Sequence, residues 1–242
     1  MSHIKRIISS LLVLILICAL IPCAFAEESR TINTPSQVLN FGLRDGRGPI
    51  SITKAVLHRG EKTDEVYLIA LAGAKLSVKQ KNNYTAFLAS SMSLPTAYLA
   101  TVKKAASEVI PEGSKLILAG HSAGGTIAQQ FAADKTMREK YEILNVLACG
   151  SPTVVLFERE GALHRLADYC DPIPQISLAG PVNIFYKVSY ENSKLLLEFE
   201  NPHAESYYSE STWSGYDCLG IRCGNAYLTC SESDCVSFSL ML

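Results

Sequence analysis

Apolar and polar residues along this chain follow two alternating patterns, one of continuous apolar runs and one of helical spacing. Short continuous apolar runs bounded by polar residues are typical of strands that are buried on both faces of a sheet. The predicted strands cover residues 64–74, 115–119, 143–148, 163–169, 182–190 and 194–199. Apolar residues at helical spacing predict helices over residues 95–110, which Pro111 closes, and over residues 122–140.

The order of these predicted elements indicates the class of fold. A strand–helix–strand–helix–strand order predicts an α/β fold with a mostly parallel sheet, right-handed crossovers and helices on both faces. We expect one such domain over residues 27–205 and a small disulfide-rich C-terminal extension over residues 206–242. With 48% hydrophobic and 19% charged residues, the chain can bury a core and does not belong to the disordered class.

The first 26 residues have the features of a secretory signal peptide. Lys5 and Arg6 precede an unbroken apolar run over residues 11–21, and Ala24-Phe25-Ala26 matches the small-x-small pattern of a cleavage site. We therefore expect cleavage near Ala26 and export of the mature protein, which is then secreted or kept in the periplasm or cell envelope. An uncleaved membrane anchor over residues 7–26 is the alternative, because that stretch is just long enough to span a bilayer.

The chain has 8 Cys, and those that remain after cleavage predict disulfide bonds. An even number of cysteines in an exported chain favours disulfides. The four in the tail are symmetric about residues 226 and 227, which suggests nested Cys218–Cys235 and Cys223–Cys230 pairs across a hairpin, with the other pairings left open. Cys149 and Cys170 form a third bridge if their strands are neighbours. A zinc site is the alternative, but the spacing lacks the usual C-x2-C pair, so we expect no metal.

The net charge limits the partners of the protein. Lys and Arg number 22 against 23 Asp and Glu, which gives a net charge of -1. A nucleic-acid binder needs an excess of Lys and Arg to displace the counterions of the phosphates, so we expect no nucleic-acid partner.

The most informative motif lies between the second predicted strand and the second predicted helix. Gly120-His121-Ser122-Ala123-Gly124 matches G-x-S-x-G in the strand-to-helix context that a nucleophile elbow requires. Such a turn strains the serine backbone, and the glycines let neighbouring backbone pass without a clash. The helix N-terminus then directs N–H groups at an oxyanion. The motif predicts Ser122 as a nucleophile, and the alternative is an ordinary glycine-rich turn.

A nucleophilic serine needs a base, and a group that orients this base. Downstream of Ser122 the chain has two histidines, His164 and His203. His164 lies inside a predicted strand and precedes the candidate acids, whereas His203 follows the last predicted strand in a turn. His203 is therefore the predicted base. The side chain of His121 is expected to diverge from the nucleophile.

The predicted acid is Asp171, in the stretch Cys170-Asp171-Pro172-Ile173-Pro174 at the C-terminal end of a predicted strand. Residues that face ligands collect at this end of parallel strands. Asp168 is the rival acid, but it lies inside the strand. The alternative for Asp171 is the common turn-forming Asp that precedes a proline.

These residues resemble the class 3 (fungal-type) lipases of the α/β-hydrolase fold, over roughly residues 66–208. The likeness rests on the elbow, on Gly150-Ser151-Pro152, on Asp171-Pro172-Ile173-Pro174, and on His203 followed by Tyr207 and Tyr208. The resemblance implies that Ser122 is the nucleophile, Asp171 the acid and His203 the base.

The same resemblance points to an oxyanion hole. The F-R-G-[ST] stretch of the family, which holds an oxyanion residue, corresponds to Leu71-Ala72-Gly73-Ala74. It implies a hole formed by the backbone N–H groups of Ala74 and Ala123, without the usual Ser or Thr hydroxyl. In another enzyme, removing one oxyanion donor lowers kcat by about 10²–10³-fold, so we expect a modest turnover here. Residues 75–94 would then lie where those lipases carry a lid, and the alternative is a loop and helix start that pack on the core.

Taken as a whole, the sequence predicts an exported serine carboxylester hydrolase, a lipase or esterase that works through a Ser-His-Asp triad and an acyl-enzyme. We expect no cofactor, an acyl ester or lipid as the substrate, and transient contact with a lipid surface. The same triad also serves thioesterases and acyltransferases. Outside enzymes, the alternative is a secreted binding module on a hydrolase scaffold, which the aromatic residues of the tail favour. The sequence does not indicate an oligomeric state.

Overall fold

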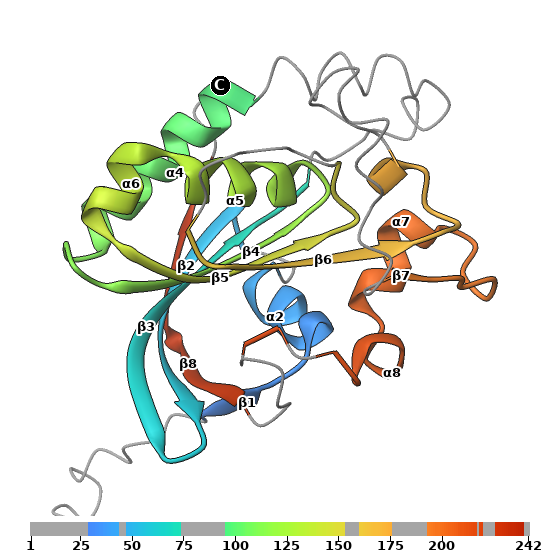
Figure 1. The fold of residues 1–242 in the computed structure, drawn as a ribbon, viewed down its shortest axis with the longest axis horizontal. Coiled ribbons are helices and arrows are strands. Elements are labelled where there is room, and N and C mark those ends of the chain that lie inside the picture. Colours follow the sequence, from blue (N-terminus) through green and yellow to red (C-terminus); the bar gives the residue numbers. More distant parts are fainter. Residues whose placement is uncertain are drawn as a thin grey trace, which may run out of the picture.

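The structure, a computed structural model, describes residues 29–43, 47–73, 95–152, 160–175, 193–216, 218–219 and 226–239 (Figure 1). A central sheet of eight strands has the order β1-β8-β2-β3-β4-β5-β6-β7. The strands are β1 (Arg30–Ile32), β2 (Ile50–Arg59), β3 (Lys62–Leu71), β4 (Lys115–His121), β5 (Glu142–Cys149), β6 (Ala162–Asp168), β7 (Ser193–Lys194) and β8 (Ala226–Phe238).

The sheet has an antiparallel half and a parallel half. The pairs β1–β8, β8–β2 and β2–β3 are antiparallel, and β3 to β7 run parallel to one another. Every residue of β4 after Lys115 is buried, as expected for a central strand with helices on both faces. The carboxyl ends of β3 to β6 meet at one edge of the sheet, where ligand sites of parallel sheets are usually found.

Helices cover both faces of the sheet (Figure 1). One face carries α4 (Pro95–Val109), α5 (Ala123–Ala133) and α6 (Lys135–Lys140). The other face carries α2 (Pro35–Gly42), beside α7 (Pro202–Glu205), η5 (Ser206–Tyr208) and α8 (Glu210–Trp213), and a short helix η2 (Ile173–Gln175) follows β6. Two buried clusters result, one that joins Leu39 and Trp213 to the sheet and one that joins Val102 and Phe131 to it.

The α/β architecture with a mostly parallel sheet agrees with the sequence prediction. The helix predicted over residues 122–140 is two helices, because Asp134 has an extended backbone with φ −67° and ψ 120°. Its carboxylate caps α6 by accepting the N–H of Met137 at 3.1 Å. The strand predicted over residues 194–199 is limited to β7, and the strand predicted over residues 182–190 lies outside the described residues.

The C-terminal residues join the main sheet instead of folding into a separate hairpin. β8 is one strand between β1 and β2, so the turn predicted at residues 226 and 227 is wrong. Ala226, Leu228 and Cys230 alternate with more exposed residues and are buried, which is the period of a strand with one face against a core. Cys230 and Cys235 lie on this one strand, opposite Ala55 and Thr53.

The described cysteines do not bridge one another. Among the residues that the structure describes, Cys149, Cys170, Cys218, Cys230 and Cys235 form no disulfide with each other. The predicted Cys218–Cys235 and Cys149–Cys170 bridges are therefore absent, and Cys223 lies outside the described residues. Cys149 faces Leu166 across the β5–β6 pair, well before Cys170 in the register.

The N-terminal prediction also lies outside the described residues. The structure does not describe residues 1–26, so signal cleavage stays a prediction. In the part of the chain that the structure does describe, no helix is long and apolar enough to cross a membrane.

Candidate active site

Ser122 lies in a strained turn between β4 and α5. Its φ of 56° is the only positive value of a non-glycine residue among the described residues, and its ψ is −124°. A Cβ on Gly120 would lie 2.3 Å from the carbonyl carbon of Gly124, and a Cβ on Gly124 would lie 2.1 Å from the carbonyl oxygen of Leu71. The motif thus forms the tight turn that the sequence predicts, in a conformation that costs roughly 1–3 kcal/mol.

Three side chains that are far apart in the sequence converge at this turn. Nε2 of His203 lies 2.9 Å from Oγ of Ser122, and Nδ1 of the same ring lies 2.8 Å from Oδ2 of Asp171. Asp171 follows β6 and is fully buried, whereas the His203 side chain is in α7 and 20% exposed. The structure therefore brings together the residues predicted as nucleophile, base and acid, with hydrogen bonds in the order that proton removal from a serine needs.

The carboxylate of Asp171 has a hydrogen-bond donor at each oxygen. The backbone N–H of Ile173 donates to Oδ1 at 2.9 Å, and the hydroxyl of Tyr207 donates to Oδ2 at 2.8 Å. Burial first, and then the charge of Asp171, raise the pKa of Tyr207 far above its usual value, so this hydroxyl stays protonated. Sequence reasoning missed this contact of Tyr207, although its position shortly after His203 was a signal.

Asp168, the rival acid, does not bond to the base. Its Oδ1 accepts the backbone N–H groups of Cys170 at 2.9 Å and Leu196 at 3.4 Å. Burial raises the pKa of Asp168 despite these bonds. Its side chain therefore organises the loop that carries Asp171 and does not serve the imidazole.

The other histidines lie in different surroundings. Nε2 of His164 on β6 lies 3.1 Å from Nδ2 of Asn145, on the neighbouring strand β5. Nε2 of His121 lies 2.7 Å from the main-chain oxygen of His203. His121 thus contacts the main chain of the predicted base, a contact that sequence reasoning missed.

The segment that follows β3 passes directly beside Ser122. A Cβ on Gly73 would lie 2.8 Å from Cβ and 3.4 Å from Oγ of Ser122, so only glycine fits there. The hydroxyl of Tyr98 lies 2.8 Å from the carbonyl oxygen of Pro49 and 3.0 Å from that of Ala72, and it holds this segment in place.

The structure describes one of the two predicted oxyanion residues. Ala123 is the first residue of α5, where backbone N–H groups have no partner within the helix. Ala74 and the predicted lid over residues 75–94 lie outside the described residues. The described segment ends at Gly73, which lies beside Ser122. An oxyanion residue is needed close to this serine.

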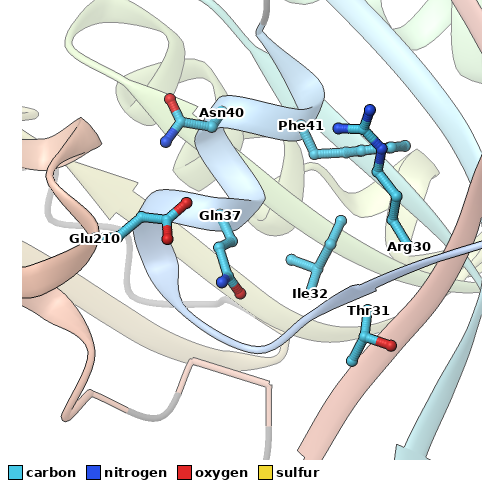
Figure 2. Close-up of a pocket in the computed structure, with 7 residues that line it drawn as sticks. All are labelled: Arg30, Thr31, Ile32, Gln37, Asn40, Phe41 and Glu210. Carbon is cyan, nitrogen blue, oxygen red and sulfur yellow. The ribbon is translucent and has the colours of Figure 1, made fainter.

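A separate cavity of about 530 Å³ lies on the α2 face of the sheet (Figure 2). Its lining combines polar side chains from β1, α2 and α8 with two apolar side chains. Its lining residues are Arg30, Thr31, Ile32, Gln37, Asn40, Phe41 and Glu210, and none of the three converging residues is among them. Within the described residues, no group of three or more His, Cys, Asp or Glu could hold a metal ion.

Comparison with known proteins identifies the family of the chain. The family model of Lipase (class 3) matches residues 56–178, about half of the sequence. The match includes Ser122 and Asp171 and ends before His203. No curated protein and no solved structure gives a significant match. The resemblance inferred from the motifs is confirmed, and the chain belongs to the class 3 lipase family.

Proposed function

We propose that this protein is an exported serine carboxylester hydrolase, a lipase or esterase that cleaves acyl esters of lipids. One observation carries the proposal: the imidazole of His203 bonds to the hydroxyl of Ser122 at 2.9 Å and to the carboxylate of Asp171 at 2.8 Å. Carboxylate, imidazole and serine in this order, with the serine on a strained turn, activate the serine toward carbonyl carbons. Membership of the class 3 lipase family supports lipid esters as the substrate class.

The first half of the reaction forms an acyl-enzyme. Nε2 of His203 accepts the hydroxyl proton of Ser122 while Oγ attacks the ester carbonyl carbon. Asp171 keeps the proton on Nδ1 and stabilises the positive charge of the ring. His203 then gives its proton to the leaving oxygen, the carbon–oxygen bond of the ester breaks, and an alcohol departs.

The second half releases the acid. His203 removes a proton from a water molecule, which attacks the acyl carbon, and Ser122 leaves with the proton that His203 returns. The negative oxygen of both tetrahedral intermediates is stabilised by backbone N–H groups. The proposed donors are Ala123, at the N-terminus of α5, and Ala74, which the family resemblance supplies.

Hydrolysis of p-nitrophenyl esters, from acetate to palmitate, tests the proposal. The protein is the mature chain that begins after Ala26. Ser122→Ala should lower kcat by at least about 10³-fold, because loss of a triad member removes the nucleophile. Ser214→Ala, which changes an exposed serine of the tail, is the matched control and should keep full activity.

The chain length that gives the highest kcat/KM separates a lipase from a short-chain esterase. Thioesters and acyl transfer to added alcohols, run with the same variants, distinguish the related acyl-transfer reactions. A folded protein that hydrolyses no ester would contradict the proposal and favour the binding module. Equal activity of Ser122→Ala and the native protein would contradict it as well.

Export rests on the predicted signal peptide and needs its own test. The full chain, expressed with an intact secretion system, should yield a mature protein whose N-terminus is Glu27. Mass spectrometry of the secreted or envelope fraction measures that N-terminus. An exported protein that still begins at residue 1 would contradict export by cleavage.

A further inference from the structure

The proposed base stands on a short and open turn. α7 contains four residues, Pro202–Glu205, and none of them is buried. A helix of this length leaves its last carbonyl groups without partners inside the helix. The hydroxyl of Ser206 donates to the carbonyl of Pro202 at 2.7 Å. The next carbonyl, that of His203, accepts from a side chain outside the turn.

That side chain is His121, whose Nε2 lies 2.7 Å from the carbonyl oxygen of His203. A carbonyl oxygen can only accept, so Nε2 of His121 carries the proton. His121 is the last residue of β4 and precedes Ser122. Two consecutive residues therefore contact the base, since Ser122 bonds to its imidazole and His121 bonds to its main chain.

Aromatic rings hold the imidazole of His121 in place. Its ring centroid lies 4.8 Å from that of His203, 5.6 Å from that of Tyr207 and 5.4 Å from that of Tyr208. Burial, and then the charge of a protonated His203, lower the pKa of His121 to about 3. The ring is therefore neutral near pH 7, and it adds no repulsion when His203 takes up the serine proton.

We infer that His121 is a positioning residue, which holds the main chain of His203 so that Nε2 of the base stays within reach of Ser122. The inference rests on the proposed function, because it applies only if His203 is the base. His121 acts through His203 and does not touch the ester. Without the bond, the open turn can shift, and a displacement of about 1 Å in a catalytic group can cost about 10²-fold in rate.

Three substitutions at residue 121 test this role. His121→Phe keeps a ring but removes the donor, His121→Gln places an amide N–H near the position of Nε2, and His121→Asn carries the same amide on a shorter side chain. We expect kcat of the Phe and Asn variants to fall by about 10- to 100-fold with KM nearly unchanged, and the Gln variant to recover most of it. His164→Phe is the matched control and should keep the native kcat, because His164 bonds to Asn145 and not to the base.

Two further measurements separate positioning from a loss of folding. The rate at which a p-nitrophenyl phosphonate labels Ser122 depends on proton removal by His203, so it should fall together with kcat. The thermal unfolding midpoint should stay near that of the native protein. If His121→Phe does not fold, the Gln and Asn variants decide, because both keep a polar side chain.

The outcomes distinguish this inference from the proposed function. Native kcat in a folded Phe or Asn variant, or a rise in KM alone, would overturn the positioning role, provided that Ser122→Ala is inactive. Full ester hydrolysis by Ser122→Ala would overturn the proposed function itself. A low kcat in the Phe and Asn variants, recovery in the Gln variant and native kcat in the His164 control would support the inference.

Discussion

The hydroxyl of Tyr207 donates to Oδ2 of Asp171 at 2.8 Å, and this is the carboxylate oxygen to which His203 also bonds. The same hydroxyl accepts the backbone N–H of Asp168 at 3.0 Å, so it connects the end of β6 to the acid. The ring of Tyr207 stacks on Trp213 with an interplanar angle of 8°. A fully buried tyrosine thus fixes the orientation of a buried carboxylate toward the base.

Tyr207→Phe removes the hydroxyl and keeps the stacked ring. We expect kcat to fall by about 10-fold, because the Asp171 carboxylate loses one of its donors and its orientation. The N–H of Asp168 is left unpaired, so the free energy of unfolding should fall by about 1–3 kcal/mol. Ester kinetics and denaturant unfolding measure the two effects, and native values for both would contradict the role of this hydroxyl.

Gly73→Ala tests how closely the segment after β3 approaches Ser122. The new Cβ would lie 2.8 Å from Cβ of Ser122, so one of the two must move. We expect kcat to fall by about 10²-fold, since a small displacement of a reacting group is costly. Gly215→Ala is the control, because nothing lies within 4 Å of its Cβ. Equal kcat for the two variants would show that the backbone does not approach Ser122 this closely.

Tyr98→Phe tests whether the Tyr98 hydroxyl supports the chain that precedes Ala74, the proposed oxyanion residue. The hydroxyl bonds to the carbonyls of Pro49 and Ala72, and the second carbonyl lies two residues before Ala74. Burial raises the pKa of Tyr98 well above its usual value, so the hydroxyl remains a donor at every pH suited to the assay. Without it we expect kcat to fall by about 10-fold with little change in KM, because the chain at Ala72, which precedes the proposed oxyanion residue, then loses this hydrogen bond. A rise in KM alone would indicate a role in substrate binding instead.

The lowered pKa of Asp134 predicts that the free energy of unfolding depends on pH. Burial alone would raise its pKa, but the hydrogen bonds from Lys103 and from the N–H of Met137 lower it below the usual 3.8. A lowered folded-state pKa stabilises the fold above the unfolded-state pKa, and this stabilisation is lost as pH falls through the folded-state value. Asp134→Ala should therefore cost about 1 kcal/mol at pH 7 and clearly less near pH 2. Urea unfolding of both proteins at the two pH values measures it, and an equal cost at both would contradict the assignment.

The parallel half of the fold was predictable because its patterns are local. The apolar runs that became β4, β5 and the second half of β3 are buried on both faces, and such runs are recognisable in the sequence alone. β6 is buried only over its last three residues. The convergence of Ser122, Asp171 and His203 was predictable from chain order and from the turn chemistry around Ser122. In each case the signal was a few consecutive residues.

The rest depended on contacts between distant segments. β8 pairs with β1 through Arg30 and Cys230, so no local pattern shows where this strand belongs. The cysteine spacing favoured a disulfide hairpin, yet the alternation of buried residues from Ala226 to Cys230 was the stronger signal. Tyr207 and His121 could not be assigned roles, because their functions are set by which groups the fold brings to them.

The identity of the nucleophile is the central claim, and covalent labelling tests it most directly. The mature protein is treated with a fluorophosphonate probe, digested with trypsin and analysed by mass spectrometry. The account predicts one probe per chain, on the peptide over residues 116–135, in which Ser122 is the only serine. Labelling should stop in Ser122→Ala and should slow strongly in His203→Ala, because the base is then missing. Ester hydrolysis without a probe on this peptide, or a probe on another residue, would contradict it.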